Sequence, residues 1–256
     1  MSRRAIVGAA SVGVVILAWQ LMGVFGLLKP PFFVPPSAVL AAGAVELVSP
    51  RFWNDVYVSG QELVYGYALA AVTAIPFGLA VGWYVRLGYL FEPLMGFMNA
   101  LPRIALMPLI LLTLGFGLWS IVTVVFLGVF FTVAINTVQG VRVVEPRYLD
   151  VARSYRARDL TRFRTVVLPS AIPFVVAGLR LGIGRALIGV VIGELYAANA
   201  GLGHMIRAAS NSLQTDRLLF ATLFLIVVSL VVSEALRSLE RRVAPWRAGV
   251  SLAAGT

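Results

Sequence analysis

The sequence contains no cysteine, one histidine and one lysine. Without cysteine, the chain forms no disulfide, thiolate zinc site or cysteine-ligated iron–sulfur cluster. With His204 alone, it cannot assemble a site from several histidines of one chain. Its lysine, Lys29, is followed by proline, so the phosphate-binding pattern G-x-x-x-x-G-K-[ST] is absent. We therefore expect no cofactor in this chain and no ATP hydrolysis by it.

Charged side chains are also scarce. They make up 12% of the 256 residues, whereas 60% are hydrophobic and the mean hydropathy is +0.92. Soluble domains are about one-quarter charged, and disordered chains are low in hydrophobicity. The composition therefore excludes both classes and indicates a polytopic, all-α membrane protein.

Six apolar runs are long enough to cross a bilayer, which takes about 20 helical residues. They cover residues 6–28, 63–85, 89–114, 121–138, 171–197 and 218–236. The first run is longer than the roughly 7–15 residues of a signal-peptide core and lacks a clean cleavage site, so we expect a retained span. Close helix contacts are indicated by three G-x-x-x-G pairs, Gly78/Gly82, Gly178/Gly182 and Gly189/Gly193.

The distribution of arginines predicts the orientation of these spans. The net charge is +10, and most basic residues fall near the chain ends and between positions 142 and 164. Cytoplasmic loops of membrane proteins carry such an excess. We therefore place both termini in the cytoplasm, and we attribute the basic charge to topology rather than to nucleic-acid binding.

The spans suggest three parts of the chain. Residues 1–62 hold the first span and an outer, proline-rich segment, in which a short amphipathic helix is expected from Ser37 to Pro50 with Ser37 as its N-cap. Residues 63–240 form a core of about five spans, and residues 241–256 form a cytoplasmic tail. His204 is expected in an outer loop, where a solvated side chain is the simplest interpretation.

The longest polar interruption of the core runs over residues 140–169. Pro146 fits the first turn of a helix, where its missing N–H costs nothing. Leu149 and Ala152 then form a small apolar face beside Arg153. This pattern predicts a short helix that lies at the cytoplasmic face rather than crossing the membrane.

A second short helix is expected in the same loop. It would start at Asp159, a favourable N-cap residue, and run towards Leu168, with Pro169 beginning the next span. The loop is thus predicted to be a helix–turn–helix. From its residues alone, it is either a basic loop that fixes topology and touches anionic lipid or a rigid surface for a partner.

Spaced motifs in and around this loop carry a family resemblance. The loop contains Asp150-Val151-Ala152, Arg156 and Val166-x-Leu168-Pro169, and it resembles the E-A-A-x-x-x-G-x(9)-I-x-L-P motif of ABC-importer permeases. Other pieces are similar to the nitrate, sulfonate, taurine and bicarbonate group: Pro102-x-Ile104-Ala105-x-Met107-Pro108-Leu109, Gly115-Phe-Gly117, Gly178-Leu179-Arg180, Glu194 and Gly201-Leu202-Gly203. The resemblance covers roughly residues 35–246.

The resemblance implies a type I importer fold of about six transmembrane helices in a bacterial inner (plasma) membrane. It implies a permease that works as a pair, most simply a homodimer, with an extracytoplasmic solute-binding protein. It also implies a cytoplasmic ABC ATPase dimer, which would bind ATP and Mg and grip the loop 140–169 as its coupling element. The implied docking residues are Asp150, Ala152, Arg153, Arg156, Leu168 and Pro169.

Two residues depart from the family motif. Asp150 replaces the usual glutamate, which keeps the charge and shortens its reach. Arg156 replaces a glycine between the two short helices, where glycine usually supplies a positive φ. Either the turn is built differently in this chain, or Arg156 contacts an acidic patch on the ATPase.

Three ionisable residues within the expected spans are candidates for a substrate path or gate. Such groups are costly in a bilayer and usually face an interior or a water-filled path. Arg185 would favour an anion such as a sulfonate, nitrate or bicarbonate, or else pair structurally. Arg103 lies between Pro102 and Pro108, which predicts a broken or kinked helix. Glu194, near an outer end, is either a cap or pair for a neighbouring helix or part of a gate.

Other functions fit the sequence less well. An ion-coupled secondary transporter of a small solute is the alternative, and ATP dependence of uptake would separate it from an importer. The sequence lacks motifs that an intramembrane enzyme would use, because the patterns G-x-S-x-G and H-E-x-x-H are absent. The sequence does not identify the transported solute.

Overall fold

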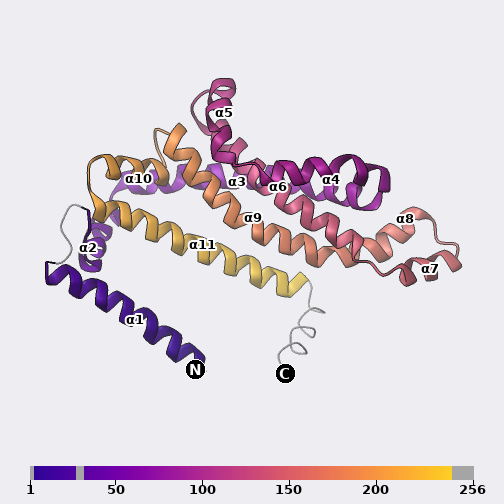
Figure 1. Ribbon diagram of the computed structural model, residues 1–256, viewed down its shortest axis with the longest axis horizontal. Helices are drawn as coiled ribbons and strands as arrows, with labels where there is room; N and C mark the ends of the chain where they lie inside the picture. The colour runs from indigo at the N-terminus through magenta and orange to yellow at the C-terminus, as the bar shows by residue number, and fades with distance from the viewer. Residues whose placement is uncertain (1–2, 27–31, 244–256) are drawn as a thin grey trace.

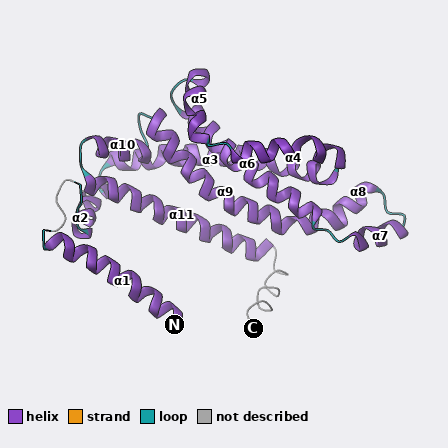
Figure 2. Cartoon of the chain, in the orientation of Figure 1, coloured by secondary structure: helices purple, strands orange, loops and turns teal. Residues whose placement is uncertain are grey.

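The computed structural model describes residues 3–26 and 32–243, and within these ranges the chain consists of helices and loops without a strand (Figures 1 and 2). Lys29 and the tail from 244 onward, including Trp246, lie outside the described residues. In chain order the helices are α1 (Arg3–Val24), α2 (Pro36–Leu47), α3 (Pro50–Trp83), α4 (Val85–Ala100), η1 (Arg103–Leu106), α5 (Met107–Leu114), α6 (Leu118–Arg142), α7 (Pro146–Ser154), α8 (Asp159–Arg162), η2 (Phe163–Val167), α9 (Leu168–Ala197), α10 (Leu202–Asn211) and α11 (Thr215–Val243).

The bundle is built around α6, which packs against both α3 and α9. Glycines permit this close approach. A Cβ atom added at Gly78 or Gly82 on α3, or at Gly178, Gly182, Gly189 or Gly193 on α9, would lie only 2.7–3.2 Å from an atom of α6. Small residues let helix backbones approach where lipid offers no hydrophobic driving force. The contacts predicted from the three G-x-x-x-G pairs are thus confirmed.

Four helical segments are long and apolar enough to cross a membrane: Pro50–Trp83, Leu118–Arg142, Asp159–Ala197 and Thr215–Ala235. The helical segments Val85–Ala100 and Arg103–Leu114 count as a fifth span if taken together, and they meet at an angle of 90°. The broken helix predicted there is confirmed. In α1, the apolar part Ala10–Val24 is shorter than these spans. It packs mainly against the α2 region, where the Trp19 indole N–H donates to the Val34 carbonyl oxygen at 3.0 Å.

Two predicted helix starts in the first third of the chain are wrong. The helix expected at residue 63 begins at Pro50, because its first four turns bury polar side chains against other helices and therefore lack an apolar run. The short helix begins at Pro36, one residue before the predicted cap. Ser37 does not cap it, since its hydroxyl instead accepts a hydrogen bond from the Gln20 amide at 3.0 Å.

The second short helix of the loop also differs from the prediction. Arg158 is the N-cap residue, and Asp159 lies inside the first turn, where its charge still suits the helix dipole. Pro169 does not end this helix, because α8, η2 and α9 run on as one span. In η2 the Leu168 N–H donates to the carbonyl of Phe163, five residues earlier. Such a wide turn accommodates a proline ring that would clash in a regular α-helix.

Candidate functional site

The loop between α6 and α9 is anchored to the bundle through apolar side chains. Leu149 of α7 and Phe163 of η2 pack against a buried cluster of Val141, Val167 and Ala171. The Phe163 ring also meets Trp83 of α3 edge-on, with ring centroids 5.5 Å apart. The helix–turn–helix is therefore fixed to three long helices, and it projects beyond them at one end of the molecule (Figure 1).

The turn between α7 and α8 has the positive backbone φ that glycine usually supplies at this position of the motif. Arg156 has φ +55°. The N–H of Ala157 donates to the carbonyl of Ala152 at 3.0 Å, and the N–H of Arg156 donates to that of Arg153 at 2.8 Å. This pair of bonds is the Schellman motif, with arginine at the left-handed position. The alternative that the turn is built differently is thus excluded.

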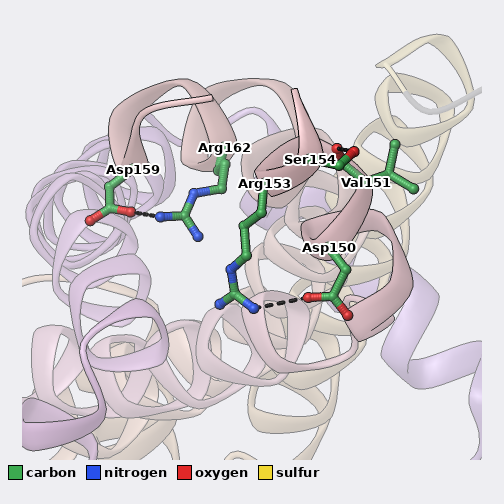
Figure 3. A network of polar contacts seen from close by, with 6 residues as sticks. All are labelled: Asp150, Val151, Arg153, Ser154, Asp159 and Arg162. Atoms are coloured by element: carbon green, nitrogen blue, oxygen red, sulfur yellow. Dashed lines mark hydrogen bonds and ion pairs between the residues drawn. The ribbon is translucent and has the colours of Figure 1, made fainter. Parts of the chain in front are cut away.

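Each short helix carries one acid–base pair three residues apart, drawn in Figure 3. An Arg153 guanidinium N–H donates to Asp150 Oδ1 at 2.9 Å, and Arg162 pairs with Asp159. Three of these four side chains are more than half exposed, and Arg162 alone is largely buried. Exposed pairs of this kind contribute little to stability, so they mainly orient the arginines.

The six predicted docking residues fall on two parts of this structure. Asp150, Arg153 and Arg156 are exposed, and Ala152 is half-buried beside them. The other two, Leu168 and Pro169, lie in the first turn of α9. A partner that grips α7 would therefore act on the long span through the continuous helix that begins at Asp159.

Two arginines lie on helices of the span region without an acidic partner among the described residues. Arg103 begins η1, directly after the 90° break that follows α4. Arg185 is exposed halfway along α9, and Gly128 in the middle of α6 faces its backbone. Arg103 is half-buried, donates weakly to Asn99 Oδ1 at 3.4 Å, and has a buried Nε without a partner. Neither arginine has an ion-pair partner in the described part of the chain.

Glu194 lies at the other end of α9, where it is fully buried. Its carboxyl accepts hydrogen bonds from the Ser59 hydroxyl and from the N–H of Gly203. Glu194 therefore ties α9 to α3 and to the start of α10, as in the pairing alternative.

The same cluster satisfies the first backbone N–H groups of α10. The Gly201 N–H donates to Asp55 Oδ1 at 2.8 Å, and the Leu202 N–H donates to Ser59 Oγ at 2.8 Å. The first four N–H groups of a helix have no partner within it, and negative charge is favoured at that end. The buried side chains of Asp55 and Ser59 on α3 therefore cap a helix more than 140 residues later in the chain.

Asp55, Ser59 and Glu62 were not among the predicted site residues. Their spacing of four and then three residues places them on one helical face, and this signal was available. It was missed because the span was expected to begin after Glu62. His204, expected in a loop, lies half-buried on α10. No group of acids and histidines in residues 3–26 and 32–243 has the arrangement of a metal site.

Comparison with known proteins agrees with this architecture. Residues 74–245 match the family described as the inner membrane component of binding-protein-dependent transport systems. The taurine transport system permease TauC of Escherichia coli (strain K12) is 28% identical, over 98% of this chain and 93% of its own. An aliphatic sulfonates transport permease, SsuC of Bacillus subtilis (strain 168), is 29% identical, over 91% of this chain and 85% of its own.

A solved structure shares the fold. An inward-facing form of the MetNI methionine ABC transporter superposes with a TM-score of 0.63 at 18% identity, covering 76% of this chain and 98% of that one. The chain therefore belongs to the permeases of binding-protein-dependent ABC importers and has their type I transmembrane fold. It is a multi-pass inner-membrane subunit without a catalytic role, and ATP is hydrolysed by a separate subunit of such transporters.

Proposed function

We propose that two copies of this chain form the path of an importer for a small anion, such as a sulfonate, with both termini in the cytoplasm. The observation that carries this proposal is the pair Arg103 and Arg185. Two uncompensated guanidinium groups within the span region are costly unless they face water or an anion. An anion on this path would compensate these charges through charge-assisted hydrogen bonds to the guanidinium groups. The taurine and sulfonate relatives support the same substrate class.

Energy enters through the loop between α6 and α9. We infer that a cytoplasmic ATPase dimer binds α7. When the ATPase dimer closes, the continuous helix from Asp159 to Ala197 would transmit this movement to the bundle. Glu194 and its partners hold the opposite end of the same helix. Tilting this rigid element would open one face of the path and close the other, as in rigid-body switching. A binding protein would deliver the solute at the outer face.

Uptake into proteoliposomes tests the anion path. The assay uses the assembled transporter with its ATPase and binding protein, and compares anionic alkanesulfonates with neutral alkyl sulfones. Arg185→Gln and Arg103→Gln should each lower the uptake of the anion about 10- to 100-fold, the range expected for one charge-assisted bond. Arg51→Gln, an exposed arginine in the first turn of α3, is the matched control. Equal residual uptake of anionic and neutral solutes by the path variants would rule out an anion-selective role.

Co-purification tests the docking surface separately. Ala152→Asp or Leu168→Asp should abolish recovery of the ATPase with the tagged permease, because each places a charge on an apolar position of the loop. Ala208→Asp, on the exposed side of α10, should leave the recovery unchanged. Full recovery with both loop variants would remove the loop from this role.

A further inference from the structure

We call the loop between α6 and α9 the coupling loop. A hollow of about 880 Å³ lies between this loop and the junction of α3 with α4. It is lined by four arginines and one acid: Arg86, Arg142, Arg153, Arg162 and Asp159. Arg86 is exposed and forms no ion pair within the described ranges. Arg142 pairs with Glu92, Arg153 with Asp150 and Arg162 with Asp159. Among the described residues that line the hollow, Arg86 therefore carries the positive charge that no acid of the chain neutralises.

The guanidinium groups of the loop converge on this space. Figure 3 shows Arg153 and Arg162 extending from the two short helices towards the gap between them. Each is held by its acid through a single nitrogen, which leaves further N–H groups of each fork free to donate. The Nε of Arg162 is buried without a partner. The geometry is that of a site for a group with several anionic oxygens.

An apolar groove of about 500 Å³ continues from the hollow along α3. The two share Trp83, Tyr84 and Asp159, and the groove reaches back to Pro76 between α3 and the side chains of Leu160 and Phe163. Seven residues separate Pro76 from Trp83, which is about 10 Å along a helix. Since α3 is long and apolar enough to cross a membrane, a groove along its last turns would extend from the interface into the hydrocarbon region.

We propose that the hollow and groove together bind one anionic phospholipid. The phosphate headgroup lies among Arg86, Arg153 and Arg162, and an acyl chain follows the groove beside Leu160. Trp83 and Tyr84 lie at the junction, where interfacial aromatic residues are expected. Basic pockets between membrane helices at the cytoplasmic side bind anionic lipid headgroups. Only the choice of leaflet rests on the orientation given under the proposed function.

A lipid fits these surfaces better than a second contact with the ATPase. A cytoplasmic protein could reach the arginines, but it could not fill a groove that extends about 10 Å into the bilayer. A free phosphate would use the arginines and leave the apolar groove empty. The bound lipid would bridge α3 and the coupling loop, so it would stiffen the contact through which the loop moves the bundle.

Native mass spectrometry of the full chain tests the site. The protein is released from neutral detergent that contains equal amounts of phosphatidylglycerol and phosphatidylcholine. We expect one phosphatidylglycerol to be retained per chain and no phosphatidylcholine. Arg86→Gln combined with Arg162→Gln should weaken retention about 30-fold. Each arginine near an anionic lipid surface contributes about 1 kcal/mol of attraction, and about 2 kcal/mol corresponds to this factor. Leu160→Ser should also weaken it, because it removes apolar surface without changing the charge.

Arg158→Gln combined with Arg164→Gln is the control, since it removes the same total charge from the loop between α6 and α9 and neither residue lines the hollow, whereas Arg86 and Arg162 both do. This variant should retain the lipid. Equal loss in both double variants would overturn the proposal, as would displacement of the lipid by an equal concentration of glycerol 3-phosphate. Loss of ATPase co-purification with lipid retention unchanged would assign the hollow to the ATPase instead. Lipid retention does not depend on solute uptake, so failure here and failure of the anion path are distinguishable.

Discussion

The hydroxyl of Ser59 on α3 donates a hydrogen bond to the carboxyl of Glu194 on α9, 135 residues away. The same hydroxyl oxygen accepts the N–H of Leu202 at the start of α10. One small side chain thus joins three helices at the end of the bundle opposite the coupling loop. This junction is buried, so each of its polar groups depends on the others for a partner.

Removing this hydroxyl should destabilise the junction. Ser59→Ala leaves the Leu202 N–H and one Glu194 oxygen without this partner, and a buried unsatisfied group costs about 1–3 kcal/mol. We expect a lower thermal unfolding temperature in detergent and faster hydrogen exchange at residues 198–205. Ser170→Ala is the control, since that exposed hydroxyl bonds only the carbonyl of its own helix. An unchanged exchange rate in Ser59→Ala would show that the cluster does not hold α10.

Gly201 should tolerate no side chain. Its φ is +114°, and a Cβ atom there would overlap the carboxyl group of Glu194. Backbone strain and overpacking together predict that Gly201→Ala lowers the free energy of unfolding by at least about 2 kcal/mol. Gly184→Ala on α9 has open space around it, and it should be neutral or stabilising by up to about 1 kcal/mol. Comparable loss of stability in both variants would contradict this account of the turn.

Arg156→Gly should separate backbone strain from partner contact. A left-handed residue other than glycine costs about 1–2 kcal/mol, so the glycine variant should slow hydrogen exchange across residues 152–163. Strained residues persist mainly where function requires the side chain. We therefore expect weaker co-purification of the ATPase despite the more stable turn. Arg158→Gln, at φ −66° two residues later, controls for the lost charge. Full ATPase recovery with Arg156→Gly would mean that the arginine makes no contact.

His204 should make the stability of α10 depend on pH. Burial lowers the pKa of His204, the charges of Arg207 and Arg51 lower it further, and Asp55 opposes them. The unfolded chain, with a pKa near 6.5, then binds the proton more tightly than the folded chain. The stabilisation is complete above about pH 6.5 and is lost as the pH falls through the lower folded value. From pH 7.5 to 5.5, the unfolding temperature should therefore fall further in the natural protein than in His204→Gln. Equal falls would contradict this, since His204 is the sole histidine.

The loop between α6 and α9 could be predicted from sequence further than the buried polar cluster around Ser59 and Glu194 could. Pro146 and the spacing from Asp150 to Pro169 are local, so they predicted the first short helix and the loop. The run of arginines predicted a surface element for the same reason. The state of the turn at Arg156 was not predictable, because arginine does not prefer a positive φ and only its hydrogen bonds hold it there.

The sequence by itself determined what depends on neighbours in the chain. Apolar runs of about 20 residues must form helices in a bilayer, and paired glycines mark where such helices approach. The tertiary structure alone decided which polar groups are satisfied by distant partners. It joined Glu194 to Ser59 and to the N–H of Gly203, and it bent the chain by 90° between α4 and the helices that follow Pro102. Those contacts depend on helix packing and direction, which hydrophobic periodicity does not encode.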